Sequence, residues 1–476
     1  MIDLARIGAH DDISYSDSLA RLYPDLFNGH MAKSVTFQVT DDCCMACTYC
    51  YQHHKQHNIM SFETAKEIID FLLDENNTYI NPTNSPGIII DFIGGEPLMA
   101  IDLIQQIADY FTKRLIELNH PWLFKHRFSM CSNGLLYFEP AVQEFISKYN
   151  NRLSFSISID GDKQLHDSCR VDLEGAGTYD RAMAAVEHYV STYKQKIGSK
   201  MTIAPGNVAF VARAVKDLFA HGYDYIHLNC VFEEGWTYNH ATVLYQQLKE
   251  LADYMLSTKM YLDHSISMFN YNQFKPMDEE NNQNWCGGVG DSMLAFDYKG
   301  DIYPCLRYME SSLPENVEPI VIGKLGRGIY VTDKEKEWQK ELNDVDRRCQ
   351  STDECFYCPI AEGCAWCSAY NYECFGTVRK RATFICPMHK ATALANVYFW
   401  NILLIMENDE RRFKNYMPDE WALQIISEKE LQLIKFLETF PTDIDISELL
   451  EIQQEFSDID LQDIVSIYRE IKNNEK

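Results

Sequence analysis

The sequence predicts an α/β protein, with a partial (β/α)6 TIM-type barrel followed by a small cysteine-rich domain and a helical C-terminal region. Strand-like and helix-like segments alternate from residue 34 to about residue 229, as they do in parallel βα units. The 16 cysteines gather mainly in two dense groups, one near the N-terminus and one within residues 286–386. A chain of 476 residues also exceeds one ordinary core, and its length suggests about three packing units.

Six segments have the patterns of buried strands. Residues 34–40 and 153–160 alternate between apolar and polar side chains. Residues 87–93 form a near-continuous apolar run, as expected for a parallel strand buried on both faces. Weaker candidates lie at 127–131, 200–204 and 224–228. Six βα units are too few for a full eight-stranded barrel, so we expect an open, partial one.

Amphipathic stretches separate these strands. Residues 61–73 begin at a capping Ser61 and carry apolar side chains on one face. Pro418 is placed to open a late helix, and Ser427 and Glu430 have the spacing of a capping box. The other expected helices span residues 103–118, 141–149, 179–193, 207–222, 242–260 and 391–414.

These elements divide the chain into five parts. In order, they are an N-terminal arm (1–33), the partial barrel (34–232), a connecting helical segment (233–284), the cysteine-rich domain (285–390) and an acidic helical C-terminal region (391–476).

Composition and charge exclude several classes of protein. The chain has 46% hydrophobic and 24% charged residues, which is globular composition. Its formal charge of −27 argues against nucleic-acid partners, because phosphate repels it. The N-terminus carries no secretory signal, and the most apolar run, 391–406, is too short to span a membrane. We therefore expect a cytoplasmic protein, in which many cysteines indicate metal rather than disulfides.

The first cysteine group follows the first strand directly and has the spacing Cys43-x3-Cys47-x2-Cys50. Three thiolates on one loop can hold three irons of a 4Fe–4S cluster, which leaves the fourth iron open to a small molecule. Zinc usually recruits two ligand pairs, and no second pair lies nearby at finger spacing. Cys44 falls outside the spacing and is interpreted as a bystander.

This loop, with Tyr49 before its last cysteine, resembles the cluster loop of the radical SAM (S-adenosylmethionine) superfamily. Gly94-Gly95-Glu96-Pro97 follows the second strand and is similar to the family motif that meets the amino group of the methionine moiety. The two glycines allow backbone carbonyls to approach a ligand, and the Glu96 carboxylate can accept a hydrogen bond from an ammonium group.

Further positions after later strands resemble the remaining SAM contacts of that family. The arginine among them has the fork geometry that a carboxylate requires. These positions are Ser132 and Asn133 after the third strand, Ser158, Asp160 and Arg170 for the ribose and the methionine carboxylate, and, as a loose match, Leu228 beside adenine.

The second cysteine group resembles the SPASM extension of radical SAM enzymes, which holds two auxiliary 4Fe–4S clusters. A zinc ribbon would explain its two CxxC pairs but neither the Gly300-x4-Cys305 element nor Cys386. The chain has Cys364-x2-Cys367 where the family usually has CxxxC. Family order assigns Cys355, Cys358, Cys364 and Cys386 to one cluster, and Cys286, Cys305 and Cys367 to the other. Cys349 and Cys374 remain open as a fourth ligand for the second cluster.

The resemblance implies a reaction in which an electron from the first cluster cleaves SAM to a 5′-deoxyadenosyl radical. It implies three 4Fe–4S clusters, a cysteine-containing precursor peptide and an electron donor such as ferredoxin or flavodoxin; it assigns no catalytic side chain. Sulfatase-maturating relatives carry an Asp base directly after the GxxxxC cysteine, where this chain has Leu306. The sequence therefore favours the maturases that form thioethers in ribosomally made peptides with repeated Cys-xxx units. A sulfatase-maturating enzyme, a non-catalytic iron–sulfur electron-transfer protein and a zinc-dependent interaction module are the alternatives.

Overall fold

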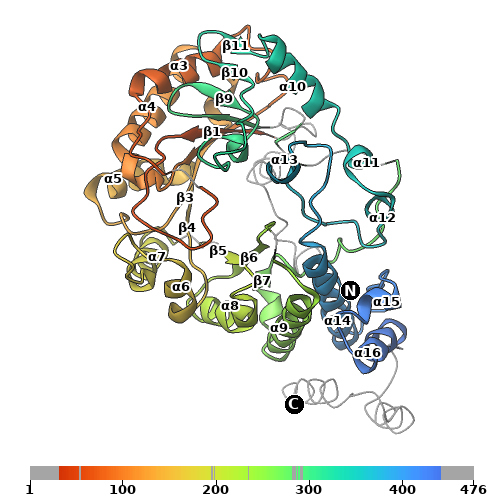
Figure 1. Cartoon of the computed structure of the whole chain (residues 1–476). Coiled ribbons are helices and arrows are strands. Elements are labelled where there is room, and N and C mark those ends of the chain that lie inside the picture. The colour runs from red at the N-terminus through yellow and green to blue at the C-terminus, as the bar shows by residue number, and fades with distance from the viewer. Residues whose placement is uncertain are drawn as a thin grey trace.

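An arc of parallel strands with helices on its outer side forms the centre of the molecule (Figure 1). This computed structural model describes residues 32–440 except 53–54, 195–196, 198, 234, 281–285, 287 and 290–292. Most of the expected N-terminal arm and the acidic segment 441–476 lie outside the described residues.

The larger sheet has eight strands in the order β11-β10-β9-β8-β1-β2-β3-β4, and β1 to β4 are parallel. Short strand β8 also pairs with β1 in parallel, with Val35 opposite Leu294, and the strands after it are antiparallel. The cysteine-rich region therefore extends the barrel sheet, which the sequence did not predict. The bounds are β1 (Lys33–Gln38), β2 (Ile88–Ile93), β3 (His126–Ser132), β4 (Leu153–Ile157), β8 (Met293–Phe296), β9 (Asp301–Tyr303), β10 (Gly323–Lys324) and β11 (Gly328–Ile329).

A smaller parallel sheet continues the arc with β5 (Ser199–Ile203), β6 (Tyr225–Cys230) and β7 (Ser265–Ile266). No strand ladder joins β4 to β5 among the described residues. Instead, the Asp160 carboxylate accepts from the Thr202 amide at 3.2 Å, and Ser199 Oγ donates to the carbonyl of Ile159 at 2.9 Å. The six predicted strands and the open barrel are confirmed, and β7 was not expected.

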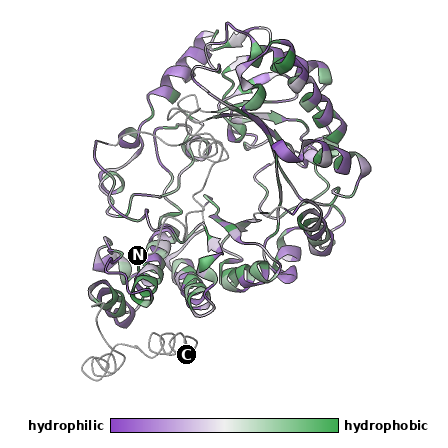
Figure 2. Ribbon diagram, turned by 180° about the vertical axis from the view of Figure 1, so that it is seen from behind, coloured by the Kyte–Doolittle hydropathy of each residue, from purple (hydrophilic) through white to green (hydrophobic). Residues whose placement is uncertain are grey.

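Helices cover the outer side of both sheets. Ser61 Oγ accepts from the Thr64 amide at 3.0 Å and so caps the first of them, as predicted. The helices alternate between hydrophilic and hydrophobic stretches (Figure 2), and their apolar residues are buried. Their bounds are α3 (Phe62–Leu73), α4 (Ile101–Glu117), α5 (Pro140–Tyr149), α6 (Lys163–Cys169), α7 (Tyr179–Tyr193), α8 (Val211–Ala220) and α9 (Tyr238–Ser257); α6 was not expected.

The cysteine-rich region is mostly loop. Its short helices are α10 (Asp333–Asn343), α11 (Arg347–Gln350), α12 (Asp353–Phe356) and α13 (Ser368–Phe375). Short 3-10 turns across the chain lie at Pro97–Ala100, Pro121–Phe124, Asn150–Arg152, Val208–Phe210, Met260–Leu262 and Leu306–Tyr308.

The C-terminal helices α14 (Cys386–Met406), α15 (Asp419–Ala422) and α16 (Glu428–Thr439) pack beside α9 (Figure 1). The helix expected over 391–414 begins at Cys386 instead, because Pro387 suits a first helical turn. Ser427 caps α16, but the Glu430 carboxylate accepts from Tyr245 and Lys249 of α9 rather than closing a capping box. This region therefore belongs to the folded core as far as residue 440.

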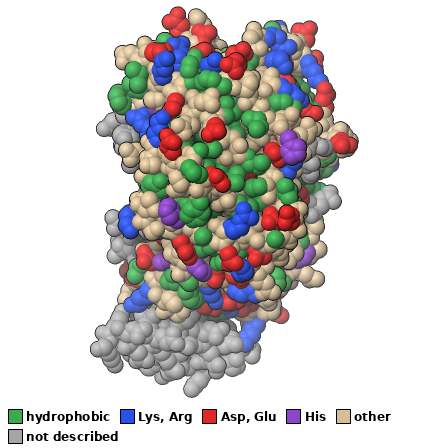
Figure 3. Space-filling model, turned by 90° about the vertical axis from the view of Figure 1, so that its left-hand side faces the viewer, with side chains coloured by type: hydrophobic (Ala, Val, Ile, Leu, Met, Phe, Trp, Pro, Cys, Tyr) green, Lys and Arg blue, Asp and Glu red, His purple; other side chains and the backbone are tan. Residues whose placement is uncertain are grey.

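The outer surface carries both signs of charge. On the face drawn in Figure 3, acidic and basic side chains are interspersed. In the described part of the chain, no helix combines the length and apolar character that crossing a membrane requires.

Candidate active site

A cavity of about 410 Å³ opens at the carboxyl ends of the barrel strands, where functional side chains gather in folds of this class. It brings together residues that the sequence places after four different strands. Of the predicted site residues, the cavity is lined by Cys43, Cys47, Tyr49, Cys50, Gly95, Glu96, Ser132, Asn133, Ser158, Arg170 and Cys367.

The two glycines let the loops after β1 and β2 interlock. A side chain at Gly95 would place its Cβ 2.2 Å from the carbonyl oxygen of Asp42, and one at Gly94 would lie 2.5 Å from that of Thr40. The Glu96 amide donates to the same Asp42 carbonyl at 2.8 Å. This close approach holds Cys43 against the glycine motif, and Pro97 then begins a 3-10 turn outside the cavity lining.

The Glu96 carboxylate joins the loops that follow β2 and β3. It accepts from the amide of Asn133 and from Ser132 Oγ, both at 2.8 Å, and from the amide of Leu98 at 3.0 Å. Burial raises the pKa of Glu96 to about 7, although these donors oppose the shift. A ligand ammonium would compensate the buried charge, which is the role the sequence predicted for this residue.

Asp160 is fully buried and organises the opposite wall. Its Oδ2 accepts from Arg170 Nε at 2.8 Å and from the Tyr49 hydroxyl, while its Oδ1 accepts from the Thr202 amide. The Arg170 guanidinium also lies 5.4 Å from the centroid of the Tyr49 ring. Asp160 is therefore a supporting residue rather than a lining one, and it leaves the terminal nitrogens of Arg170 for a ligand carboxylate.

Replacing Arg170 by alanine is expected to weaken SAM binding by about 1.5–3 kcal/mol, roughly ten- to hundredfold, because a charge-assisted contact is lost. Isothermal titration calorimetry of the anaerobic protein measures this. Arg181→Ala, on the outer helix α7, is the matched control. A dissociation constant unchanged by Arg170→Ala would refute the assignment.

Leu228 does not line this cavity. Its amide donates to Ser267 Oγ at 2.9 Å and its carbonyl accepts from the same hydroxyl at 3.1 Å. Leu228 and Asn229 both line a smaller cavity of about 140 Å³, and Asn229 also lines the large one. The loose match of Leu228 concerns its backbone beside adenine, and it stays a prediction.

Several lining residues were missed because they lie in strands and loops without a recognisable motif. Arg307 is one of them; it comes from the cysteine-rich region, as does the predicted Cys367, and these two lining residues connect that region to the barrel cavity. The others are Met45, Tyr51, Lys55, Cys131, Lys200, Thr202, Asn229, Val231, Phe232 and Glu233.

The three thiols of the first loop face one another across the cavity edge. Burial raises the pKa of Cys47, the nearby Arg170 charge lowers it, and the Cys43 and Cys50 thiolates raise it again. Cys44 has a different environment, because its sulfur accepts from Asn133 Nδ2 at 3.2 Å. A hydrogen bond with Cys43 also lowers the pKa of Cys44, so the separation of Cys44 from the three-cysteine set stays a prediction.

The remaining predicted cysteines form two groups. In the near set (Cys286, Cys305 and Cys367), burial raises the pKa of Cys305 and the other two thiolates raise it further. The far set (Cys355, Cys358, Cys364 and Cys386) behaves alike: burial raises the pKa of Cys386 to about 11, and the other three thiolates add to this. A cavity of about 450 Å³ is lined by all four cysteines of the far set.

Neither candidate for an extra ligand joins the near set. The Cys349 sulfur lies 3.3 Å from the carbonyl oxygen of Asp346, and its pKa responds to Asp346 and Arg379 rather than to the near thiols. Cys374 is exposed and interacts with Tyr370. Among the described residues, the near set therefore supplies three thiols.

These donor sets suit iron–sulfur clusters better than single metal ions. No three His, Cys, Asp or Glu side chains in the described ranges converge closely enough for one ion. A four-iron cluster binds each thiolate at a separate iron, so its ligands need not meet at one point.

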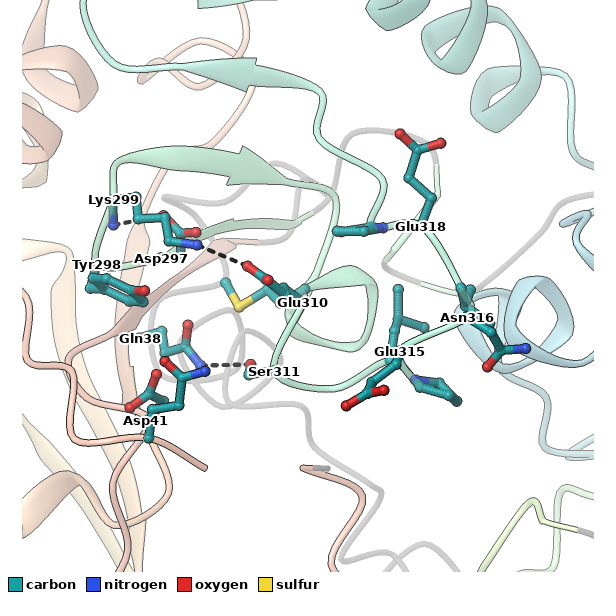
Figure 4. A pocket seen from close by; sticks show the side chains of 16 residues that line it. Gln38, Asp41, Asp297, Tyr298, Lys299, Glu310, Ser311, Glu315, Asn316 and Glu318 are labelled. Carbon is teal, nitrogen blue, oxygen red and sulfur yellow. Dashed lines mark hydrogen bonds and ion pairs between the residues drawn. The ribbon is translucent and has the colours of Figure 1, made fainter. Parts of the chain in front are cut away.

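A second large cavity, of about 580 Å³, lies beside the carboxyl end of β1 (Figure 4). Gln38 Nε2 donates to Ser311 Oγ at 2.7 Å, and Lys299 pairs with Glu310 at 2.8 Å. No cysteine lines it. The candidate site is therefore the cavity of about 410 Å³, which Cys43, Cys47 and Cys50 line together with Cys367.

Comparisons with known proteins agree with this geometry. The family described as a 4Fe-4S single cluster domain matches residues 28–161. The cysteine-type anaerobic sulfatase-maturating enzyme of Clostridium perfringens is 23% identical over 328 residues, 65% of this chain and 82% of that enzyme. The solved structure of native anSMEcpe with bound AdoMet and Cp18Cys peptide is 18% identical and covers 76% of this chain and 96% of its own, with a TM-score of 0.56. The chain is thus similar to radical SAM proteins and has a SPASM-like architecture.

Its other relatives are similar over shorter stretches. The radical SAM cyclopropyl synthase TigE of Paramaledivibacter caminithermalis is 27% identical over 156 residues, 30% of each chain. An uncharacterised protein of Methanocaldococcus jannaschii is 28% identical over 190 residues, 40% of this chain and 59% of that protein's length. The named relatives are radical SAM enzymes, and they include a maturase.

Proposed function

We propose that the chain is a peptide maturase that joins a cysteine sulfur to a carbon of another residue in a ribosomally made peptide. The observation that carries this proposal is the position of Cys367. It belongs to the near set, yet it lines the same cavity as the SAM motif residues Glu96, Ser158 and Arg170. A substrate sulfur held at the near set would therefore lie within one cavity with bound SAM.

The proposed ligand sets follow the three thiol groups. Cys43, Cys47 and Cys50 would hold the cluster that binds SAM, and the near and far sets would hold two auxiliary 4Fe–4S clusters. When bound, SAM and its cluster supply a 5′-deoxyadenosyl radical that abstracts a hydrogen atom. Three thiols in the near set leave one iron for a substrate thiolate, which is the ligand such iron prefers.

The electrons and atoms of the proposed reaction balance. One hydrogen atom leaves the peptide carbon with 5′-deoxyadenosine, and the thiol proton leaves to solvent. Formation of the C–S bond would release one electron, which an auxiliary cluster bound at the near or far set would take up and an external one-electron carrier of the ferredoxin or flavodoxin class would remove. No general base is required for the carbon.

Leu306 is the second support for thioether formation. It packs in a small apolar cluster with Ala295, Tyr303 and Met309, so its position offers no proton acceptor. Sulfatase maturation remains the second candidate, because the Clostridium perfringens maturase aligns over 82% of its length. It would need another base, and the Glu233 carboxylate at the cavity wall is the side chain placed to supply one.

Mass spectrometry of a cysteine-rich peptide encoded beside this chain's gene separates the two candidates. A thioether lowers the peptide mass by about 2 Da per crosslink and makes its sulfur resistant to alkylation. Formylglycine formation removes the sulfur itself. Loss of sulfur from the peptide would overturn the thioether proposal in favour of the second candidate, and an unmodified peptide under SAM-cleaving conditions would also contradict it.

A further inference from the structure

Arg381 binds the far set directly. Its Nη1 donates to the sulfur of Cys355 at 3.4 Å, and its Nη2 donates to the sulfur of Cys364 at 3.0 Å. The guanidinium lies 4.9 Å from the centroid of the Trp366 ring, and the backbone amide of Arg381 donates to the carbonyl of Gln350 at 3.1 Å. These contacts fix one cation against two of the four thiols.

Lys390 brings a second cation to the same site. It lies one helical turn after Cys386 in α14, so the two side chains share a face. Its Nζ is 3.7 Å from the centroid of the Trp421 ring and 3.4 Å from the Tyr238 hydroxyl, and the residue is only 4% exposed. Within the described ranges, no carboxylate forms a salt bridge with Lys390 or Arg381.

The near set has a different charge balance. Its neighbouring cation is Arg307, which reaches the cavity beside Cys367. The Arg307 guanidinium is 3.5 Å from the Glu233 carboxylate and 3.6 Å from that of Glu373. Two carboxylates therefore offset the cation at the near set. At the far set, Arg381 contacts sulfurs, the Trp366 ring and the carbonyls of Cys364 and Ala365, and in the described part of the chain no ion pair offsets its charge.

This difference decides which site is easier to reduce. One-electron reduction adds a negative charge to an iron–sulfur cluster, and both buried cations and hydrogen bonds to the sulfurs stabilise the reduced form. Low-dielectric surroundings strengthen such interactions. A cluster at the far set would thus gain stabilisation on reduction that the near set lacks.

We propose that Arg381, supported by Lys390, raises the reduction potential of the cluster held by the far set and makes it the electron acceptor of the auxiliary pair. The far cluster would take the single electron released on C–S bond formation and pass it to the external carrier. This inference rests on the ligand sets of the proposed function, and Arg381 acts in it as a tuning residue that never touches substrate.

Potentiometric titration of the complete protein, followed by electron paramagnetic resonance, tests the inference. The Cys358→Ala protein is expected to lose the far cluster and with it about four irons per chain. The signal that disappears in this variant is assigned to the far set. At the wild-type midpoint potential, Arg381→Leu is expected to lower the ratio of reduced to oxidised far cluster about tenfold, a shift of about 59 mV for a one-electron couple. The midpoint potential of Arg381→Lys is expected to lie between those of the wild type and Arg381→Leu.

The chain offers a matched control two residues before Arg381. The Arg379 guanidinium is 3.9 Å from the Asp344 carboxylate, and Arg379 does not line the far-set cavity. Arg379→Gln removes the same charge without touching a sulfur. It is expected to keep the wild-type midpoint potential, and a shift equal to that of Arg381→Leu would show that any nearby surface charge has the same effect and would overturn the inference.

The outcomes separate this inference from the proposed function. An unchanged midpoint in Arg381→Leu, with full iron content, overturns the inference and leaves the ligand sets standing. Iron content unchanged by Cys358→Ala instead overturns the ligand assignment and the inference together. If Arg381→Leu does not assemble its cluster, Arg381→Lys and Lys390→Gln decide: a more negative midpoint supports the inference, and wild-type midpoints in both overturn it.

Discussion

Replacing Cys47 by alanine is expected to abolish SAM cleavage. The three-cysteine loop would lose one of only three protein ligands, and a cluster held by two thiolates does not keep an open iron in a fixed position. Cys47 lines the cavity beside Arg170 and faces the other two thiols of its loop. Chromatographic measurement of 5′-deoxyadenosine from the anaerobic, reconstituted protein gives the readout.

Cys44→Ala is the matched control for this experiment. Cys44 falls outside the Cys43-x3-Cys47-x2-Cys50 spacing, and its side chain forms hydrogen bonds with Asn133 and with Cys43. The Cys44→Ala protein is expected to produce 5′-deoxyadenosine at a rate within a few-fold of wild type, since one neutral hydrogen bond contributes about 1 kcal/mol. Wild-type cleavage by Cys47→Ala would refute the radical SAM reading of this loop.

Cys305→Ala is expected to eliminate thioether formation and to remove about four irons per chain, because two remaining thiols in the near set cannot hold a cluster. Cys305 is half-buried, and the Cys286 and Cys367 thiolates raise its pKa. Iron and sulfide analysis together with peptide mass spectrometry measures both effects.

Two cysteines of the same region provide controls that the sequence alone could not select. Cys349 bonds within its own turn, and Cys374 is exposed. Cys349→Ala and Cys374→Ala are expected to retain all iron and to crosslink the peptide. Loss of four irons in either variant would make that cysteine the fourth ligand of the near set, and direct capture of a substrate thiolate would then fail.

Local sequence patterns were sufficient for the barrel strands. Residues 34–40 and 153–160 carry strong alternation, and residues 87–93 are apolar throughout; the corresponding strands β1, β4 and β2 are in the structure. The parallel pairing of β8 with β1 was beyond reach, because β8 is only four residues long and its partner is far away in the chain. Pairings of that kind depend on tertiary packing and not on local propensity.

The residues of the candidate site also fall into two kinds: those that sequence motifs predict and those that only the folded chain brings together. Motif residues such as Glu96, Ser158 and Arg170 were predicted from their order after successive strands, and the structure brings them into one cavity. Arg307 and Arg381 carry no motif, and only the folded chain places them beside thiols. Asp160 was expected to contact the ligand, but the structure uses its buried carboxylate to fix Arg170 and to join β4 to β5.

Electron paramagnetic resonance of the reduced protein, with and without a cysteine-containing precursor peptide, tests the central claim most directly. That claim is that the near set leaves one iron for a substrate thiolate beside the SAM cavity. The peptide is expected to change the signal of one auxiliary cluster, and its Cys→Ser version is not, because a hydroxyl is a poor ligand for cluster iron. Identical spectra with and without bound cysteine peptide would contradict the account.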